Sequence, residues 1–497
     1  MKRHPFLLLV ACLPSLPMAL PASAQTYRQR PIRLVNPFPP GGVTALAARL
    51  VADILLALLA LLALVALPAH AWSNHTLVTY RAFETMPEVS KAAAVRVEPL
   101  ESFLKAQEVP IAQLLSSQEQ WARANMPHYA PRAANLDFKA NPARTDAARR
   151  EAFLAALRIS PLSKFALYLQ PDLRTTPDLA RRMPHQEVNF LPEQPNDERR
   201  FIRIEPGERV APLAVLASAS DEPDFGLDIN LWDDSPSPWG KTYGFGPIPF
   251  GNPALYYATQ APFHMGFYHQ DWLIYKAAPF LQRTYPLLRV QQYTGLAALA
   301  FRTGHPYWGW RFSGLALHYI QDLTQPYHAS LAPGESTFQL IGANILSMAG
   351  FPQRRDDFVV LLSNRHLALE KFQNEAMVAN ARANADSSLE RALRRLELDV
   401  VYPTWTALYA RDVVAFEAFG SSERTVNTII ATMPAAFVSD PGFDFGVKEA
   451  GIDLSAEIEK LGPGKRAALE ALVADLLARL GAHSRNTMRG ILRATQP

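Results

Sequence analysis

The sequence predicts an all-α protein with long loops and an inserted region. Apolar residues recur at helical spacing along much of the chain. The alternation of apolar and polar residues that marks strands is scarce. With 497 residues, 49% hydrophobic and 19% charged, the chain has the composition of a globular protein with a large core.

Six stretches of helical spacing are separated by polar connections. The predicted helices cover residues 92–125, 143–158, 261–302, 311–323, 358–418 and 463–492. Polar, proline-containing connections are predicted over residues 126–142 and 183–209. A long loop rich in Asp, Gly, Pro and Ser is predicted over 217–251, and an insert or loop over 331–357. No internal repeat interrupts this order.

The charge is unevenly placed. Six basic residues and one acidic residue give residues 1–71 a charge of +5, so the rest of the chain carries −2 of the net +3. A slightly acidic body has no electrostatic footprint for duplex nucleic acid. The single cysteine, Cys12, lies in this first segment, so the body must bind any metal through His, Asp, Glu or backbone groups.

Residues 1–71 are predicted to be a leader that is removed. Residues 2–25 combine basic residues, a short apolar run and an Ala-Ser-Ala tripeptide, which are typical of a signal peptide. A second apolar run at 54–68 precedes an Ala-His-Ala cleavage tripeptide, so Trp72 is predicted to begin the mature protein. We therefore expect export to the periplasm or the extracellular space. An uncleaved membrane anchor is the alternative.

Between these two signals lies RPIRLVNPFPPGGVTALAARLVAD, residues 30–53. It resembles the start of a substrate-binding receptor of the tripartite tricarboxylate transporters. The resemblance stops at Asp53, so we interpret the first 50 or so residues as a fused or mis-started segment.

The motif HYIQDLTQPYH at residues 318–328 carries the chemistry. His318 and Asp322 are four residues apart, so a helix places both on one face, one turn apart, where both can reach one cation. Pro326 ends or kinks that helix, which can bring His328 back toward the same place.

Further ligand types flank this motif. His366 and Glu370 are again four residues apart on a predicted helix. Taken singly, each candidate has an ordinary structural explanation: a solvated ion pair, a turn-forming loop aspartate or a core histidine. The candidates before the motif are, in chain order, Trp72, His75, Asp224 and His264.

In the order Trp…His…Asp…His…HxxxDxxxxxH…HxxxE, the chain from Trp72 to about Glu370 resembles the zinc-dependent phospholipase C family and the related single-strand nucleases. Those proteins are all-α and hold three clustered zinc ions. The resemblance implies one zinc on Asp224, His264, His318 and Asp322, and a second on His328, His366 and Glu370. It implies a third on His75, the other oxygen of Asp322, and the free α-amino nitrogen and carbonyl oxygen of Trp72. Asp224 would also orient or deprotonate the attacking water.

The spacing departs from the family pattern in two places. About 150 residues separate His75 from Asp224, which predicts an insert or lid over 90–215, and the step from Asp224 to His264 is also long. The substitutes for these two ligands are Asp221, Asp228 and His269. The histidines that fit no position, and that are predicted to be structural or on the surface, are His128, His185, His305 and His483.

The leading hypothesis for the function is a phospholipase C that releases phosphorylated head groups from phospholipid at a membrane surface. Glu370 resembles the lipase branch, and the aromatic stretch 243–268 predicts either a lipid-facing mouth or ordinary core. The alternative within the same chemistry is a nuclease that stacks single-stranded bases on aromatic rings. The third hypothesis is an exported binding protein without catalysis. No protein partner is evident.

Overall fold

A helical hairpin forms the centre of the fold. α12 (Pro286–Arg302) and α13 (Pro306–Leu323) each begin at a proline and are joined by three residues. Every residue of α13 from Tyr307 to Leu323 is buried, as expected of a helix that is apolar on most of its faces. The structure is a computed structural model that describes residues 72, 74–193, 199–251 and 256–495.

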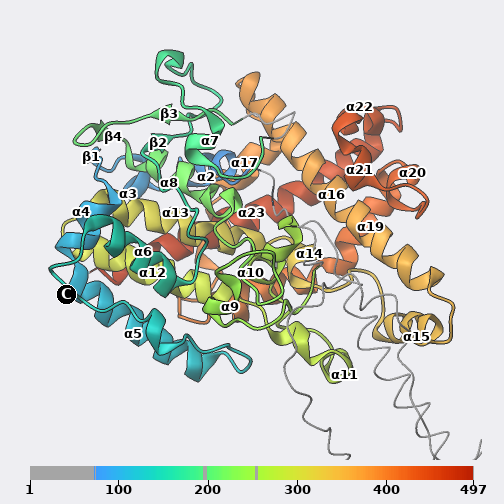
Figure 1. The fold of residues 1–497 in the computed structure, drawn as a ribbon. Helices are drawn as coiled ribbons and strands as arrows, with labels where there is room; N and C mark the ends of the chain where they lie inside the picture. The colour runs from blue at the N-terminus through green and yellow to red at the C-terminus, as the bar shows by residue number, and fades with distance from the viewer. Residues whose placement is uncertain (1–71, 73, 194–198, 252–255, 496–497) are drawn as a thin grey trace, which may run out of the picture. The chain divides into compact units, whose positions relative to one another are not determined.

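Segments from distant parts of the sequence pack around this hairpin. α8 (Pro212–Ser220) and α23 (Pro463–Arg493) pack on α13, and α2 (His75–Phe83) packs on both α8 and α23. Figure 1 shows this assembly, in which blue α2 and red α23 meet near the central α13. The Asn74 side chain accepts a hydrogen bond from Leu77 N and caps α2 at its start.

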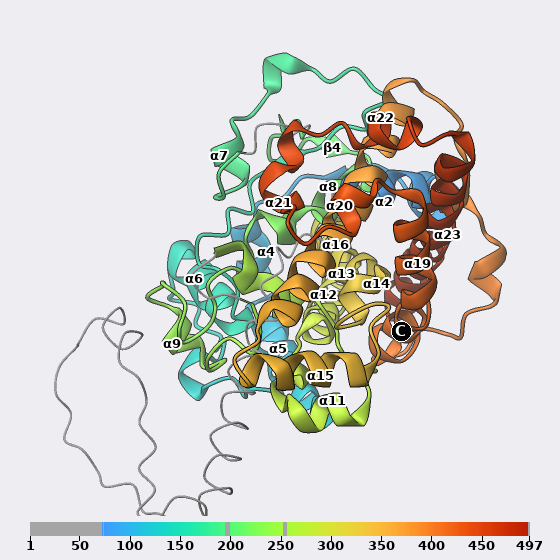
Figure 2. The same cartoon turned by 90° about the vertical axis from the view of Figure 1, so that its right-hand side faces the viewer.

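The remaining helices lie around this assembly, and Figure 2 shows the C-terminal ones from the side. Before the hairpin they are α3 (Pro87–Ser90), α4 (Leu100–Ala106), α5 (Glu108–Asn125), α6 (Asp146–Leu157), α7 (His185–Val188), α9 (Gly240–Tyr243), α10 (Ala261–His264) and α11 (Trp272–Ala277). After it come α14 (Pro326–Ala329), α15 (Thr337–Met348), α16 (Gln353–Arg382), α17 (Ser388–Arg394), α18 (Phe416–Gly420), α19 (Ser422–Thr432), α20 (Ala435–Val438), α21 (Phe445–Lys448) and α22 (Leu454–Glu459).

Strands are few and short. β1 (Val95–Arg96) pairs antiparallel with β4 (Arg209–Val210), and β2 (Tyr168–Leu169) pairs antiparallel with β3 (Ile202–Arg203). Helices hold 62% of the described residues and strands 2%, which confirms the predicted all-α class. All four strands lie in the predicted insert, residues 90–215, where α5 packs on α12 and β1 contacts α13.

Gly314 sets the spacing between α13 and α8. A Cβ atom at this position would lie 2.4 Å from the Leu216 carbonyl oxygen and 2.6 Å from the Ala219 Cβ. Neither neighbour is the end of a flexible side chain, so only glycine allows this approach. The close contact brings the end of α8 beside the next turn of α13, where His318 lies.

The structure corrects two of the predicted segments. Residues 331–357 contain α15, whose start is a capping box of Ser336 and Gln339; the loop prediction missed this local signal. The helix predicted over 358–418 is wrong in part, because α16 ends at Arg382 and Asn384 has a left-handed φ of 48°. Within the described residues, no helix is both long and apolar enough to cross a membrane.

Candidate metal centre

The central motif folds as its spacing predicts. His318 and Asp322 lie one turn apart on α13, and both are fully buried. α13 ends at Leu323, and Pro326 takes the first position of α14, which the Gln325 side chain caps by accepting from Tyr327 N. This sharp break turns the chain so that His328 also lies in the buried interior.

Four side chains that are far apart in the sequence meet beside α13, and we call them group A: Asp224, His264, His318 and Asp322. Asp322 Oδ2 lies 2.8 Å from His264 Nδ1 and 3.3 Å from His318 Nε2, and these two nitrogens are 3.1 Å apart. Asp224 Oδ1 lies 3.7 Å from His318 Nε2 and 4.0 Å from His264 Nδ1. Group A therefore points four donor atoms at one small volume.

A second cluster, group B, contains His328, His366 and Glu370. His328 Nε2 lies 3.2 Å from His366 Nε2 and 3.8 Å from Glu370 Oε1, and His366 Nε2 lies 2.7 Å from the same oxygen. His366 and Glu370 stand one turn apart on α16, as predicted. Gln325 Nε2 donates to Glu370 Oε1 at 3.0 Å and holds the carboxylate in place.

His75 lies next to group A, beside the second carboxylate oxygen of Asp322. Its Nε2 lies 3.3 Å from Asp322 Oδ1, the oxygen that group A leaves unused. Its donor atoms also lie within 4.8 Å of those of Asp224 and His318. The two oxygens of Asp322 thus face different histidines, which is the arrangement of a bridging carboxylate.

Hydrogen bonds on the side of the ring that faces away from the centre fix the orientation of three of the histidines. His318 Nδ1 donates to the Ser220 carbonyl at 2.8 Å, and His328 Nδ1 donates to the His264 carbonyl at 3.0 Å. His75 Nδ1 donates to Gln321 Oε1 at 2.8 Å. In each neutral ring the opposite nitrogen, Nε2, then carries its lone pair toward the centre, as in metal-binding histidines.

A buried aspartate supports His264 in the same way. Asp228 Oδ2 lies 3.5 Å from His264 Nε2 and accepts from the Tyr319 hydroxyl, while Oδ1 accepts from Arg289 Nε at 2.8 Å. Sequence reasoning proposed Asp228 only as a substitute ligand and did not propose Gln321 at all. Gln321 lies inside the HYIQDLTQPYH motif, next to Asp322, and that position was the available signal.

Neighbouring carboxylates raise the pKa values of two histidines in the centre, His264 and His75. Burial lowers the pKa of His264, but hydrogen bonds to Asp228 and Asp322 outweigh it and raise the pKa to about 10. Burial also lowers the pKa of His75. The hydrogen bond to Asp322 and the charge of that carboxylate outweigh the effect of burial and raise the pKa to about 9. Burial would raise the pKa of Asp322, but the charge of His318 and its other imidazole partners hold it well below its usual range.

Group B has the opposite character. Burial lowers the pKa of His328 to about 3, so this ring stays neutral with its lone pair available. Burial also raises the pKa of Glu370 well above its usual range. A divalent cation bound to group B would supply a positive charge and so favour the ionised form of the Glu370 carboxylate.

The donor atoms fit a four-coordinate metal. Bonds of about 2.0–2.2 Å in a tetrahedron place neighbouring donors about 3.3–3.6 Å apart, and the distances in groups A and B scatter around these values. Asp224 Oδ1 and Glu370 Oε2 are buried and accept no hydrogen bond from the described residues, which is costly unless something else satisfies them. Groups A and B can each bind a metal ion through nitrogen and oxygen donors alone.

Trp72 lies against the same centre. Its ring is buried, and its Nε1 donates to Thr324 Oγ1 at 3.2 Å, two residues after Asp322. The predicted cleavage before Trp72 involves residues 1–71, which lie outside the described part of the chain, as do the receptor-like segment and both predicted signals. The main-chain ligands predicted for Trp72 therefore stay a prediction.

The structure brings all eight of the predicted ligand side chains into this centre. Of the three substitutes, Asp228 lies behind His264, and the other two have partners outside the centre. Asp221 accepts from Thr76 N and Gln170 Nε2, and His269 donates to the Arg411 carbonyl. The histidines without a predicted role also lie outside: His185 bonds Leu191 O, His305 bonds Glu98, His483 bonds Glu417, and His128 is exposed.

Comparison of the chain with protein-family models, with curated proteins and with solved structures finds no match.

Proposed function

We propose that this chain is a zinc-dependent hydrolase of phosphodiester bonds that holds three zinc ions. The observation that supports it most strongly is the buried convergence of groups A and B with His75, in which Asp322 faces two sets of histidines. Nitrogen and oxygen donors without any thiolate suit zinc and other borderline cations. Zinc ions bound there would activate water and offset charge on the phosphoryl oxygens.

The protein residues then have separate tasks. Group A supplies two carboxylates and two imidazoles, enough to fill a zinc ion, whereas group B supplies three donors and leaves a position for another ligand. Asp224 directs Oδ1 toward the other donors of group A, so its second carboxylate oxygen is left for another task. We assign to this second oxygen the orientation of the attacking water and the acceptance of its proton.

The substrate that we propose is phospholipid, cleaved between glycerol and phosphate. The carboxylate at the fourth position after His366 is glutamate, as in the lipase branch that the sequence resembles. Residues 72–497 carry −2, which gives no attraction to a long polyanion. A single-strand nuclease of the same chemistry is the alternative.

Export and maturation belong to the same proposal. A free α-amino group at Trp72 exists only after cleavage of the preceding peptide bond. Because the Trp72 ring is buried beside Thr324, that amino group would be released close to His75 and Asp322. We therefore propose that removal of the leader, during export to the periplasm or beyond the cell, completes the third zinc position.

The test is the purified mature protein assayed on phosphatidylcholine and on single-stranded DNA, with zinc and with a chelator. We expect hydrolysis of phosphatidylcholine that the chelator abolishes. His318→Ala should lose both zinc and turnover, because His318 Nε2 faces the three other donors of group A. His305→Ala, which removes a histidine outside the centre, is the matched control and should keep its zinc.

Activity that is indifferent to the chelator, or full zinc loading in His318→Ala, would contradict the proposal. Hydrolysis of DNA alone would instead favour the nuclease. A protein with neither activity and with zinc content near zero would favour a binding protein.

A further inference from the structure

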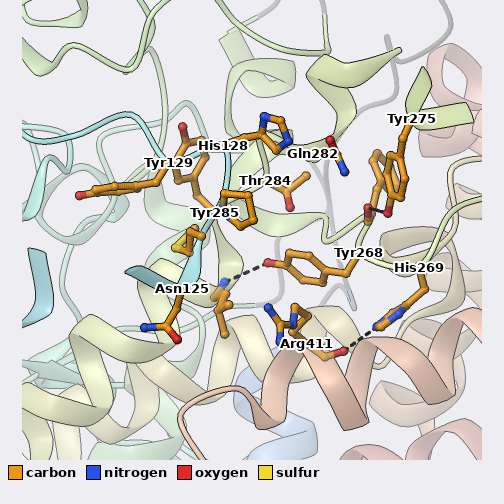
Figure 3. Close-up of a pocket in the computed structure, with 14 residues that line it drawn as sticks. Asn125, His128, Tyr129, Tyr268, His269, Tyr275, Gln282, Thr284, Tyr285 and Arg411 are labelled. Carbon is orange, nitrogen blue, oxygen red and sulfur yellow. Dashed lines mark hydrogen bonds between the residues drawn. The ribbon is translucent and has the colours of Figure 1, made fainter. Parts of the chain in front are cut away.

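A cavity of about 250 Å³ lies close to the candidate centre and is walled by aromatic rings. Figure 3 shows tyrosine rings on several of its sides, contributed by segments from different parts of the chain. A cavity of about 150 Å³ holds a benzene ring, so this one has room for a larger apolar group. The rings and thioether that define it belong to Met126, Tyr129, Phe267, Tyr268, Tyr275 and Tyr285.

The polar ends of these tyrosines are engaged in the wall. The Tyr275 hydroxyl donates to the Phe267 carbonyl at 2.6 Å, and the Tyr129 hydroxyl donates to Glu119 at 2.5 Å. The Tyr268 hydroxyl accepts from Leu287 N at 3.2 Å, as the dashed line in Figure 3 shows. The cavity is therefore lined mainly by ring surface, which favours an apolar occupant.

The wall of the cavity is attached to the centre. Gly266 N donates to the His328 carbonyl at 2.8 Å, and Gln270 Nε2 donates to the Ala329 carbonyl at 2.9 Å, so residues 266–270 run along α14. Phe267 follows the ligand His264 by three residues, which limits the separation of their Cα atoms to about 11 Å. The cavity wall and the ligand His264 therefore belong to one short segment that packs against α14.

Two exposed aromatic side chains lie next to wall residues of this cavity. Trp272 is 65% exposed and lies on α11, one turn before the wall residue Tyr275. Lys276 Nζ lies 5.7 Å from the Trp272 ring, and a tryptophan beside a long basic side chain is typical of contact with a lipid–water interface. Phe416 is 60% exposed and packs edge-on against the wall residue His269, with ring centroids 5.3 Å apart.

A second apolar surface lies at the same end of the molecule. Figures 1 and 2 both place α11 and α15 at the lower edge. α15 has no charged residue in TFQLIGANILSM and exposes Phe338 and Ile345, of which Phe338 is 80% exposed. Large apolar side chains gathered on one side are uncommon on a surface that faces only water.

The charge around the cavity argues against a polyanion. Among the residues that line it, Arg411 is the only one with a permanent charge, and its guanidinium is paired with Asp412 at 2.6 Å. Binding of a nucleic-acid strand requires several cations that neutralise phosphates. The walls thus favour a hydrocarbon chain over a nucleotide.

We propose that this cavity receives an acyl chain of a phospholipid while Trp272 and Phe416 contact the lipid surface. This inference rests on the proposed function, because it names the group that positions the phosphodiester beside the centre. The chain enters between the tyrosine rings, and the glycerol and phosphate extend along residues 266–270 toward group B.

Two variants separate the parts of this proposal. Gln282→Trp places a large ring in the cavity from the edge of a 3-10 turn (Pro279–Gln282), and Trp272→Ala removes the exposed anchor. Val447→Ala is the matched control, because Val447 is 78% exposed on the distant α21. Circular dichroism and zinc content verify that each variant is folded and loaded.

Two measurements are made with the zinc-loaded protein. The first is co-sedimentation with vesicles of long-chain phosphatidylcholine, which needs no turnover. The second is the ratio of the hydrolysis rate on those vesicles to the rate on a soluble phosphatidylcholine with short acyl chains. We expect Trp272→Ala to reduce co-sedimentation about tenfold, Gln282→Trp to lower the rate ratio about tenfold, and Val447→Ala to change neither.

The outcomes distinguish this inference from the proposed function. Hydrolysis with an unchanged rate ratio in Gln282→Trp would overturn the acyl-chain site and leave the phospholipase intact. Hydrolysis of single-stranded DNA that Gln282→Trp impairs would overturn it in favour of a base-binding cavity. If the protein hydrolyses neither phospholipid nor DNA, the proposed function is contradicted. Equal co-sedimentation of Trp272→Ala and the wild type would in that case also overturn the proposed contact with the lipid surface.

Discussion

Replacing Asp322 with Asn tests whether one carboxylate serves two metal positions. Oδ2 lies 2.8 Å from His264 Nδ1 and 3.3 Å from His318 Nε2, and Oδ1 lies 3.3 Å from His75 Nε2. Asn keeps the shape but has no negative charge and only one acceptor atom. Asp322→Asn should therefore lose two of the three proposed zinc ions and keep the one proposed for group B.

Glu370→Gln is the matched control, because Glu370 belongs only to group B. It should lose one ion and keep two. A ligand present at 100 times its Kd stabilises the folded state by about 2.7 kcal/mol. Under such zinc conditions the metal contribution lost should be about 5 kcal/mol in Asp322→Asn and about 3 kcal/mol in Glu370→Gln.

The assay combines elemental analysis of dialysed protein with urea unfolding in zinc and in a chelator. The chelator should remove the metal part of the difference between variants, leaving only the effect of the substitutions on the zinc-free fold. Equal metal content in Asp322→Asn and Glu370→Gln would refute the reasoning, because loss of a ligand shared by two sites should release more metal than loss of a ligand of one site.

Three further predictions concern the surroundings of the centre. Gln321→Met keeps the volume of the side chain but removes the acceptor for His75 Nδ1. The affinity for zinc, measured by competition with a chelating dye, should fall about 10- to 100-fold. An unchanged affinity would contradict the role of Gln321. Gly314→Ala should destabilise the fold by about 1–3 kcal/mol in urea unfolding. The control is Gly342→Ala, whose Cβ meets no atom within 4 Å and which should stabilise α15 by about 0.5–1 kcal/mol. Equal effects of the two substitutions would argue against close packing at Gly314. Burial lowers the pKa of His483, even though Glu417 opposes this shift. The unfolded chain, with a His pKa of about 6.5, therefore binds the proton more readily, and stability should fall as pH decreases below about 6.5. His483→Gln should make that decrease shallower in unfolding curves from pH 7.5 to 5.5, and an unchanged slope would contradict it.

The sequence predicted what depends on short-range spacing. The four-residue steps from His318 to Asp322 and from His366 to Glu370 require only a helix, and α13 and α16 provide it. Pro326 was predicted to end the helix, and α13 ends three residues before it. The capping box at Ser336 carried a signal of the same kind for α15, which the loop prediction overlooked.

Long-range features could not be read in the same way. That Asp224 rather than Asp228 faces His318 depends on how the turn after α8 lies against α13, which the close approach at Gly314 fixes. Asp228 and Gln321 act behind the predicted ligands, and their chemistry resembles that of any buried polar residue until their neighbours are known. The cavity near the centre depends on side chains from several distant segments, so no local pattern could have predicted it.

The position of α23 has a consequence for how the protein is made. This helix follows every predicted ligand in the sequence, yet Ser484 receives a hydrogen bond from Gln321 Nε2, and Arg485 Nη1 donates to the Ala82 carbonyl of α2. A chain emerging from a ribosome therefore lacks this support for the centre until α23 has been synthesised. Because closing so long a loop slows folding, we expect metal ions to be acquired only after synthesis of the chain is complete.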